Sequence, residues 1–361
     1  MRLILTQECD APGGAVPPPS RYKEMVAEAQ LAEELGYSCY SLSEQHFGTT
    51  IATVSSPECF LGYLAAATET IRLRVTSFVL LSYNHPLRVA ERTATLDVLC
   101  DGRFELGTAR SNNPRTLEAF GVSPNQTRAM WDESLTIIRE ALSRQTFSHD
   151  GELWQIPELT IMPRPIQTPH PPIHVSATSI ETHRNAGKRG IGMMTGNSLP
   201  GGWEYLERAV AAYREGQGEA DIGPGALTDS TGALAALAYC APTKEEAHEV
   251  GREPAMRFVT EVAKWYERLS KESTDYAELG PLKEVVDRQE DLDHMIERAP
   301  YISIGTPDFF VERCEKLAAL GYEEFILRID GMGHERTMAT IELIGREVLP
   351  RVAELNAVPS A

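Results

Sequence analysis

Three short polar segments of the chain carry the side chains best suited to chemistry. Residues 43–48 read SEQHFG, and their histidine, His46, can hold or transfer a proton near neutral pH. Residues 107–113 read GTARSNN, and Arg110 is a permanent cation whose planar fork suits a phosphate group. Residues 176–179 read SATS, and small hydroxylated residues at a helix start leave backbone N–H groups free to bind an anion. These residue types indicate a proton-handling group and a phosphate-binding cradle.

Each of these segments also fits an ordinary structural role. His46 could be a satisfied structural histidine, Arg110 could pair with an acidic neighbour, and residues 176–179 could cap a helix, which does not exclude phosphate binding. His170 and His174 have the spacing of metal ligands, but they lie in a proline-rich stretch that cannot be helical. We therefore predict no metal site.

Alternating short apolar runs and amphipathic helices favour parallel βαβ units, and eight such strands indicate an α/β fold of the (β/α)₈ barrel type. Active sites of these barrels lie at the C-terminal ends of the strands, where all three polar segments fall. A doubly wound open sheet is the alternative, but it would usually show a glycine-rich phosphate turn after its first strand, and none is present. We expect the strands at residues 2–6, 37–42, 73–81, 103–107, 173–177, 190–195, 234–240 and 322–329.

We interpret the chain as one domain, residues 1–361, with insertions near residues 146–162 and 244–297. The first insertion reads as a β-hairpin with an Asp-Gly turn. The second is a polar, charged stretch that is too long for a plain crossover, so we expect extra helices and loops near the end of the seventh strand. This stretch could form a lid over the site or pack on the outside of the barrel.

The composition limits the partners of the protein. A net charge of −18 and a pI near 5.0 disfavour binding to nucleic acid or anionic lipid. No apolar stretch approaches the roughly 20 residues that span a bilayer, and the N-terminal apolar run is too short for a signal peptide. The 6 cysteines are scattered without a C-x-x-C pair, as in reduced cytosolic proteins. We therefore expect a cytoplasmic protein without nucleic-acid or membrane partners.

Several motifs, in the same order along the chain, resemble those of the bacterial luciferase-like monooxygenase family. Residues 43–47 resemble that family's E-H-H-F segment, and residues 67–73 resemble the A-T-E-T sequence that leads into its third strand. Residues 84–91 resemble its H-P-x-R-x-A-E helix start, and residues 96–110 resemble its L-D…G-R-F-x-x-G-x-x-R pattern. The resemblance covers nearly the whole chain, since two further matches lie at residues 305–307 and 348–350.

The resemblance implies a barrel that binds reduced flavin mononucleotide (FMN), receives it from a separate flavin reductase, and uses O₂ to oxygenate a small organic substrate. The absence of a dinucleotide fingerprint agrees with a reductant that comes from another protein. A helix-rich face of the barrel is a common dimer surface in that family, so the resemblance also implies a homodimer. The resemblance also implies that FMN is bound by Arg110 and by four residues around the start of the helix after the fifth strand: Ala177, Thr178, Ser179 and Thr182.

Two further sets of residues are assigned by the resemblance. Ser77 and Phe78 match the family's non-prolyl cis peptide, against which the flavin ring packs. Such a bond costs about 3–4 kcal/mol and is retained only for a reason such as shaping a site. Glu44, Gln45 and His46 are the implied catalytic residues, with His46 positioning substrate or managing a proton during oxygen transfer.

The sequence departs from the family pattern at two positions. Gln45 replaces the first histidine of E-H-H-F, and Ala109 replaces the reactive cysteine beside the flavin in luciferase itself. Glutamine cannot act as a base at neutral pH, so these departures disfavour light emission from long-chain aldehydes. They leave oxygenation of another substrate as the first hypothesis. The alternatives are a deazaflavin-dependent hydride-transfer oxidoreductase and a non-catalytic flavin-binding subunit.

Overall fold

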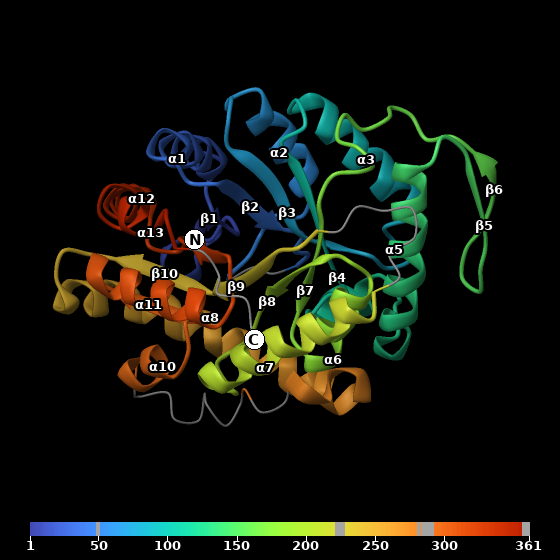
Figure 1. Ribbon diagram of the computed structural model, residues 1–361. Coiled ribbons are helices and arrows are strands. Elements are labelled where there is room, and N and C mark those ends of the chain that lie inside the picture. Colours follow the sequence, from blue (N-terminus) through green and yellow to red (C-terminus); the bar gives the residue numbers. More distant parts are fainter. Residues whose placement is uncertain (48–50, 221–227, 280–281, 283–291, 356–361) are drawn as a thin grey trace.

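The computed structural model describes residues 1–47, 51–220, 228–279, 282 and 292–355. In this part of the chain, parallel strands close into an eight-stranded barrel with helices around it (Figure 1). The predicted (β/α)₈ fold is thus confirmed. The order around the barrel is β1 (Arg2–Thr6), β12 (Glu324–Arg328), β9 (Thr231–Ala235), β8 (Gly192–Thr195), β7 (Ile173–Ala177), β4 (Phe104–Ala109), β3 (Arg72–Val79) and β2 (Cys39–Ser43).

The barrel strands are buried along nearly their whole length, because helices cover their outer faces and side chains fill the interior. Polar and charged strand residues, such as Arg74 and Glu105, are therefore buried together with the apolar ones. The principal helices outside the barrel are α1 (Arg21–Leu35), α2 (Pro57–Ala65), α3 (Pro86–Leu99), α4 (Pro114–Ala119), α5 (Thr127–Ser143), α6 (Ile180–Lys188), α7 (Gly202–Gly218), α11 (Pro307–Ala319), α12 (His334–Glu347) and α13 (Leu349–Val352).

A buried ion cluster fills the N-terminal end of the barrel. Arg74 of β3 is fully buried, and its Nε lies 2.7 Å from Glu105 Oε2 while its Nη1 lies 2.8 Å from Glu324 Oε2. Two carboxylates around one guanidinium compensate the burial of these charges. These charged groups occupy the barrel interior at its N-terminal end.

The predicted bounds of the seventh strand, residues 234–240, are wrong. β9 ends at Ala235, and Leu237–Cys240 forms a separate strand, β10, that leaves the barrel. β10 pairs in parallel with β11 (Ile302–Gly305), a strand that the sequence analysis did not predict. Both β9 and β10 are buried apolar runs, so hydrophobic pattern alone could not separate a barrel strand from a strand outside it.

The two predicted insertions have distinct structures. Residues 147–159 form an antiparallel hairpin of β5 (Phe147–Asp150) and β6 (Gln155–Leu159), which projects away from the barrel near α5 (Figure 1). The second insertion contains α8 (Lys244–Glu272), η3 (Thr274–Leu279) and α10 (Leu292–Arg298); its residues 280–281 and 283–291 lie outside the described part of the chain. Short 3₁₀ segments, η1 (Pro12–Gly14) and η2 (Pro124–Gln126), complete the elements. In the ranges described above, no helix is long and apolar enough to cross a membrane.

Candidate active site

A cavity of about 620 Å³ opens at the C-terminal ends of the barrel strands. We call it the barrel cavity. Its size falls in the range of small-molecule and cofactor sites. The second insertion contributes to its wall through Phe258, Val262, Trp265 and Tyr266 of α8 and through Asp275 and Tyr276 of η3. The inserted helix therefore lies over the site and is not merely packed against the outer helices.

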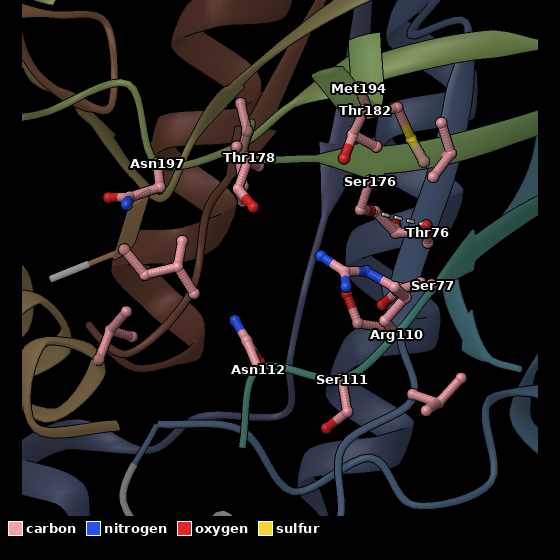
Figure 2. A pocket seen from close by; sticks show the side chains of 18 of the residues that line it. Thr76, Ser77, Arg110, Ser111, Asn112, Ser176, Thr178, Thr182, Met194 and Asn197 are labelled. Atoms are coloured by element: carbon pink, nitrogen blue, oxygen red, sulfur yellow. Dashed lines mark hydrogen bonds between the residues drawn. The ribbon is translucent and has the colours of Figure 1, made fainter. Parts of the chain in front are cut away.

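Six of the ten residues singled out from the sequence line the barrel cavity, and four lie behind its wall. The lining residues are Glu44, Gln45, Ser77, Arg110, Thr178 and Thr182. Figure 2 shows Ser77, Arg110, Thr178 and Thr182 among the side chains that line this cavity. Those behind the wall are His46, Phe78, Ala177 and Ser179.

Arg110, directly after β4, is a partly buried cation with incomplete pairing. Its guanidinium lies 5.0 Å from the centre of the Tyr276 ring, and its Nη2 lies 3.5 Å from the carbonyl oxygen of Asp275. Burial lowers the pKa of Arg110, with Arg128 adding to the effect. Its Nη1 has no hydrogen-bond partner and lies 3.8 Å from Asp275 Oδ2. A buried guanidinium nitrogen without a hydrogen bond, facing a cavity, is suited to an anion.

The segment after β7 combines helix capping with an open hydroxyl surface. Ser179 caps α6, because its Oγ accepts a hydrogen bond from the backbone N–H of Thr182 at 3.1 Å and lies 2.8 Å from Thr182 Oγ1. Thr178 and Thr182 line the barrel cavity, while Ala177 is fully buried. Ser179 therefore has the capping role, and the two threonines contribute to the cavity surface.

The prediction of a cis bond at Ser77–Phe78 is wrong. Within the described ranges, cis peptide bonds occur only before Pro163 and Pro169. The pairing of β3 with β4 instead shifts register between Val75 and Phe78. Such an irregularity redirects a side chain without the energy that a non-prolyl cis bond requires. Ser77 faces the barrel cavity, whereas the Phe78 side chain is completely buried and belongs to the core.

Glu44 is the centre of a hydrogen-bond network at the end of β2. Its Oε2 accepts from the backbone N–H of Val79 at 3.0 Å, and Asn84 Nδ2 donates to both carboxylate oxygens at 2.8 and 2.9 Å. His46 Nε2 lies 2.7 Å from Glu44 Oε1. These hydrogen bonds tie the end of β3 to the loop after β2.

His46 lies in an aromatic cluster behind the cavity wall. Its ring packs edge-on against Tyr83 and Phe120, with ring centres 5.6 and 5.2 Å apart. Its backbone carbonyl accepts a hydrogen bond from Asn113 Nδ2 at 2.9 Å. His46 does not line the cavity but is bonded to Glu44, which does, so the geometry favours a positioning role over direct contact with substrate.

Other cavity residues escaped the sequence analysis. Three of the charged or amide-bearing ones, Glu8, Asn197 and Arg328, stand within three residues of the end of a barrel strand. The rule that sites form there could have identified them. Trp131 and Tyr266 lie on helices, and their sequence positions gave no comparable indication.

Comparison with curated proteins gives relatives of known and unknown activity. The chain is 26% identical over 348 residues to the oxygenase component of flavin-dependent trigonelline monooxygenase from Acinetobacter baylyi, which covers 92% of this chain and 90% of that protein. It is 31% identical over 198 residues to the uncharacterized protein y4wF of Sinorhizobium fredii. That match spans 55% of this chain and 56% of the length of y4wF.

Solved structures share the fold at low sequence identity. The oxygenating constituent of 3,6-diketocamphane monooxygenase from Pseudomonas putida, in complex with FMN, matches with a TM-score of 0.72 and 21% identity over 98% of this chain and 99% of that chain. The coenzyme F420-dependent tetrahydromethanopterin reductase from Methanopyrus kandleri has the same TM-score, 0.72, with 18% identity over 97% of this chain and 99% of that chain. The model of the family described as luciferase-like monooxygenase matches residues 3–324, and the chain therefore belongs to the luciferase-like monooxygenase family.

Proposed function

We propose that this protein is the oxygenase component of a two-component system, which binds reduced FMN and uses O₂ to oxygenate a small organic substrate. The observation that carries the proposal is the buried Nη1 of Arg110, which has no hydrogen-bond partner and lies in the wall of the barrel cavity on the same side as Thr178 and Thr182. The trigonelline monooxygenase relative, named as flavin-dependent and as an oxygenase component, supports the same assignment.

The cavity residues fit a phosphorylated flavin. Arg110 would hold the phosphate, with the hydroxyls of Thr178 and Thr182 as further donors. Ser77 and Ala109, at the ends of neighbouring strands, have short side chains that leave room for a planar ring. When bound, reduced FMN supplies the two electrons with which one oxygen atom of O₂ enters the substrate and the other leaves as water.

The protein's own contribution is to bind and orient the flavin and the substrate and to shield them from water. The hydrogen bonds of Glu44 to Val79 and Asn84 hold the end of β3, and with it Ser77, in one position. Phe258 and Val262 of α8 add apolar surface to the cavity wall. An apolar wall excludes water, and exclusion of water suppresses unproductive release of the reducing equivalents.

The decisive experiment is an anaerobic titration of the purified protein with reduced FMN, with a parallel titration with reduced F420. We expect tight binding of reduced FMN. We also expect NADH alone to reduce no bound FMN, whereas NADH with an added flavin reductase should start O₂ consumption. Preferential binding of F420 would support the deazaflavin hydride-transfer alternative. Tight FMN binding without O₂ consumption, in the presence of a working reductase, would support the non-catalytic subunit. Binding of neither cofactor would refute all three assignments.

We also propose a cytoplasmic homodimer. The 6 cysteines are all free, which favours a reducing compartment. Tyr63 of α2 and Leu99 of α3 are large apolar side chains with 62% and 56% of their surface exposed. The two helices meet beside them, since a Cβ on Gly62 would lie 3.9 Å from Leu99 Cδ1. This surface is our candidate for the dimer contact, and sedimentation velocity would measure the oligomeric state.

A further inference from the structure

A second polar centre lies across the barrel mouth from Arg110. In the closed strand order, β1 lies opposite β7 and β12 lies opposite β4. Glu8 follows β1 by two residues, and Arg328 ends β12. Both line the barrel cavity. The cavity therefore has a proposed phosphate-binding end and a distinct end that carries a carboxyl group and a guanidinium.

Glu8 is held rigidly but its carboxylate is incompletely bonded. Its backbone N–H donates to Asp330 Oδ2 at 2.7 Å, and its carbonyl accepts from the N–H of Thr53 at 2.9 Å. Only 8% of the residue is exposed. Its Oε2 is buried without any hydrogen-bond partner. Since an unsatisfied buried carboxylate oxygen is costly, this atom is prepared for a donor that enters the cavity.

Arg328 presents the complementary group. Its Nη2 donates to Asp10 Oδ2 at 2.9 Å and to the carbonyl of Ile51 at 2.7 Å, and its Nη1 donates to the carbonyl of Ala236 at 3.1 Å. The guanidinium lies 4.6 Å from the centre of the Phe258 ring. These contacts fix the side chain, but its Nε has no hydrogen-bond partner. One free donor is therefore locked in the same end of the cavity as the free acceptor of Glu8.

The cavity wall near these two residues is mostly apolar, with the Ser43 hydroxyl at Glu8 as a polar exception. Ile51, Ala52, Ala236 and Tyr301 all line the barrel cavity and are buried in the fold. A ligand here must be largely apolar, with one small polar group that can donate to a carboxylate and accept from an N–H. A hydroxyl group meets both requirements, because its single oxygen is both donor and acceptor.

We propose that Glu8 and Arg328 recognise a hydroxyl group on an otherwise apolar substrate, and that Glu8 accepts the proton of that hydroxyl. In this step the substrate O–H bond breaks, its electron pair stays on the oxygen, and the proton joins Glu8 Oε2. Arg328 Nε–H then donates to the resulting oxyanion. The proposal rests on the proposed function, because it names the class of substrate that the monooxygenase would take: hydroxylated, ionisable compounds such as phenols.

The charges around Glu8 suit a proton acceptor at neutral pH. Burial raises its pKa to about 7, with Asp330 and Asp10 acting in the same direction, while Arg328 and the Ser43 hydroxyl oppose the rise. Asp10 is itself paired with Arg257 of α8 at 2.9 Å, so the second insertion is part of this charge network. A carboxyl with such a pKa changes between neutral and ionised forms within the physiological range.

The test compares binding of 2-naphthol with binding of its methyl ether, 2-methoxynaphthalene, by calorimetry at pH 6, 7 and 8. The ether can accept hydrogen bonds but cannot donate one to a carboxylate. We expect 2-naphthol to bind about tenfold more tightly than the ether at pH 8, where Glu8 is ionised, and the preference to shrink at pH 6. Any difference in size between the probes is independent of pH.

Glu8→Gln supplies the discriminating variant, because it keeps the shape of the side chain and leaves the backbone anchors of residue 8 in place. It should abolish the pH dependence of the hydroxyl preference and leave FMN affinity unchanged. Glu158→Gln, at an exposed position of β6, is the matched control and should keep both properties. The inference would be overturned if the wild type bound no 2-naphthol, or if it bound 2-naphthol no more tightly than the ether. It would also be overturned if the pH dependence of this preference survived in Glu8→Gln. Loss of FMN binding in the wild type would instead overturn the proposed function and leave the hydroxyl result standing.

Discussion

Replacing Arg110 by alanine isolates the phosphate-binding assignment. Arg110 contributes a partly buried guanidinium whose Nη1 is buried and has no hydrogen-bond partner in the protein. A hydrogen bond between charged groups contributes about 1.5–3 kcal/mol, so its loss should weaken FMN binding about 10- to 150-fold. Riboflavin lacks the phosphate and should bind the variant as it binds the wild type. The measurement is the ratio of the FMN and riboflavin dissociation constants, determined by fluorescence titration.

The fold should tolerate this substitution. Arg110 is partly buried at a desolvation cost that lowers its pKa, and Asp275 keeps its ion pair with Arg128 at 3.4 Å. We therefore expect a melting temperature close to that of the wild type. Arg144→Ala, on an exposed arginine paired with Glu140 at 3.6 Å, is the control for loss of a positive charge. Equal weakening of FMN and riboflavin, or no change in either, would refute the phosphate role of Arg110.

Three other predictions concern charge and assembly. Asp275→Asn should strengthen FMN binding by up to about fivefold in the same titration, because Asp275 competes with the phosphate for Arg110 at 3.8 Å; weaker binding would contradict this. Burial alone would raise the pKa of Glu324, but the Arg74 guanidinium outweighs this effect and lowers the pKa to about 2. The contribution of Glu324 to the free energy of unfolding should therefore be complete above pH 4.5 and be lost as the pH falls towards 2. Glu324→Gln should lower the free energy of unfolding at pH 7 by about 3–5 kcal/mol and flatten this acid dependence in urea titrations; an unchanged acid profile would exclude Glu324 as its source. Leu99→Lys should convert the proposed homodimer to a monomer in sedimentation velocity, and a persisting dimer would place the contact elsewhere.

The barrel could be predicted because each strand is a separate apolar run between helices, and β1 and β7 were predicted with their observed bounds. The boundary between β9 and β10 could not be predicted, because both segments are apolar and only their different strand partners separate them. The extra strand β11 shares this ambiguity: it is four buried residues within a helical region.

The candidate site was predictable where the chemistry of a residue coincides with its place at a strand end. Arg110 and Thr178 meet both conditions and line the cavity. His46 meets them in sequence, yet its ring turns behind the wall because Tyr83 and Phe120 pack against it. Glu8 was missed because an isolated glutamate carries no motif, and its significance comes from burial and from an unsatisfied oxygen, which only three-dimensional packing reveals.

The most direct test of the central claim is a crystal structure of the protein with FMN. We predict that the flavin occupies the barrel cavity, with its phosphate within hydrogen-bond distance of Arg110 and of the hydroxyls of Thr178 and Thr182. A phosphate bound away from Arg110, or a flavin bound outside the C-terminal mouth of the barrel, would contradict the account.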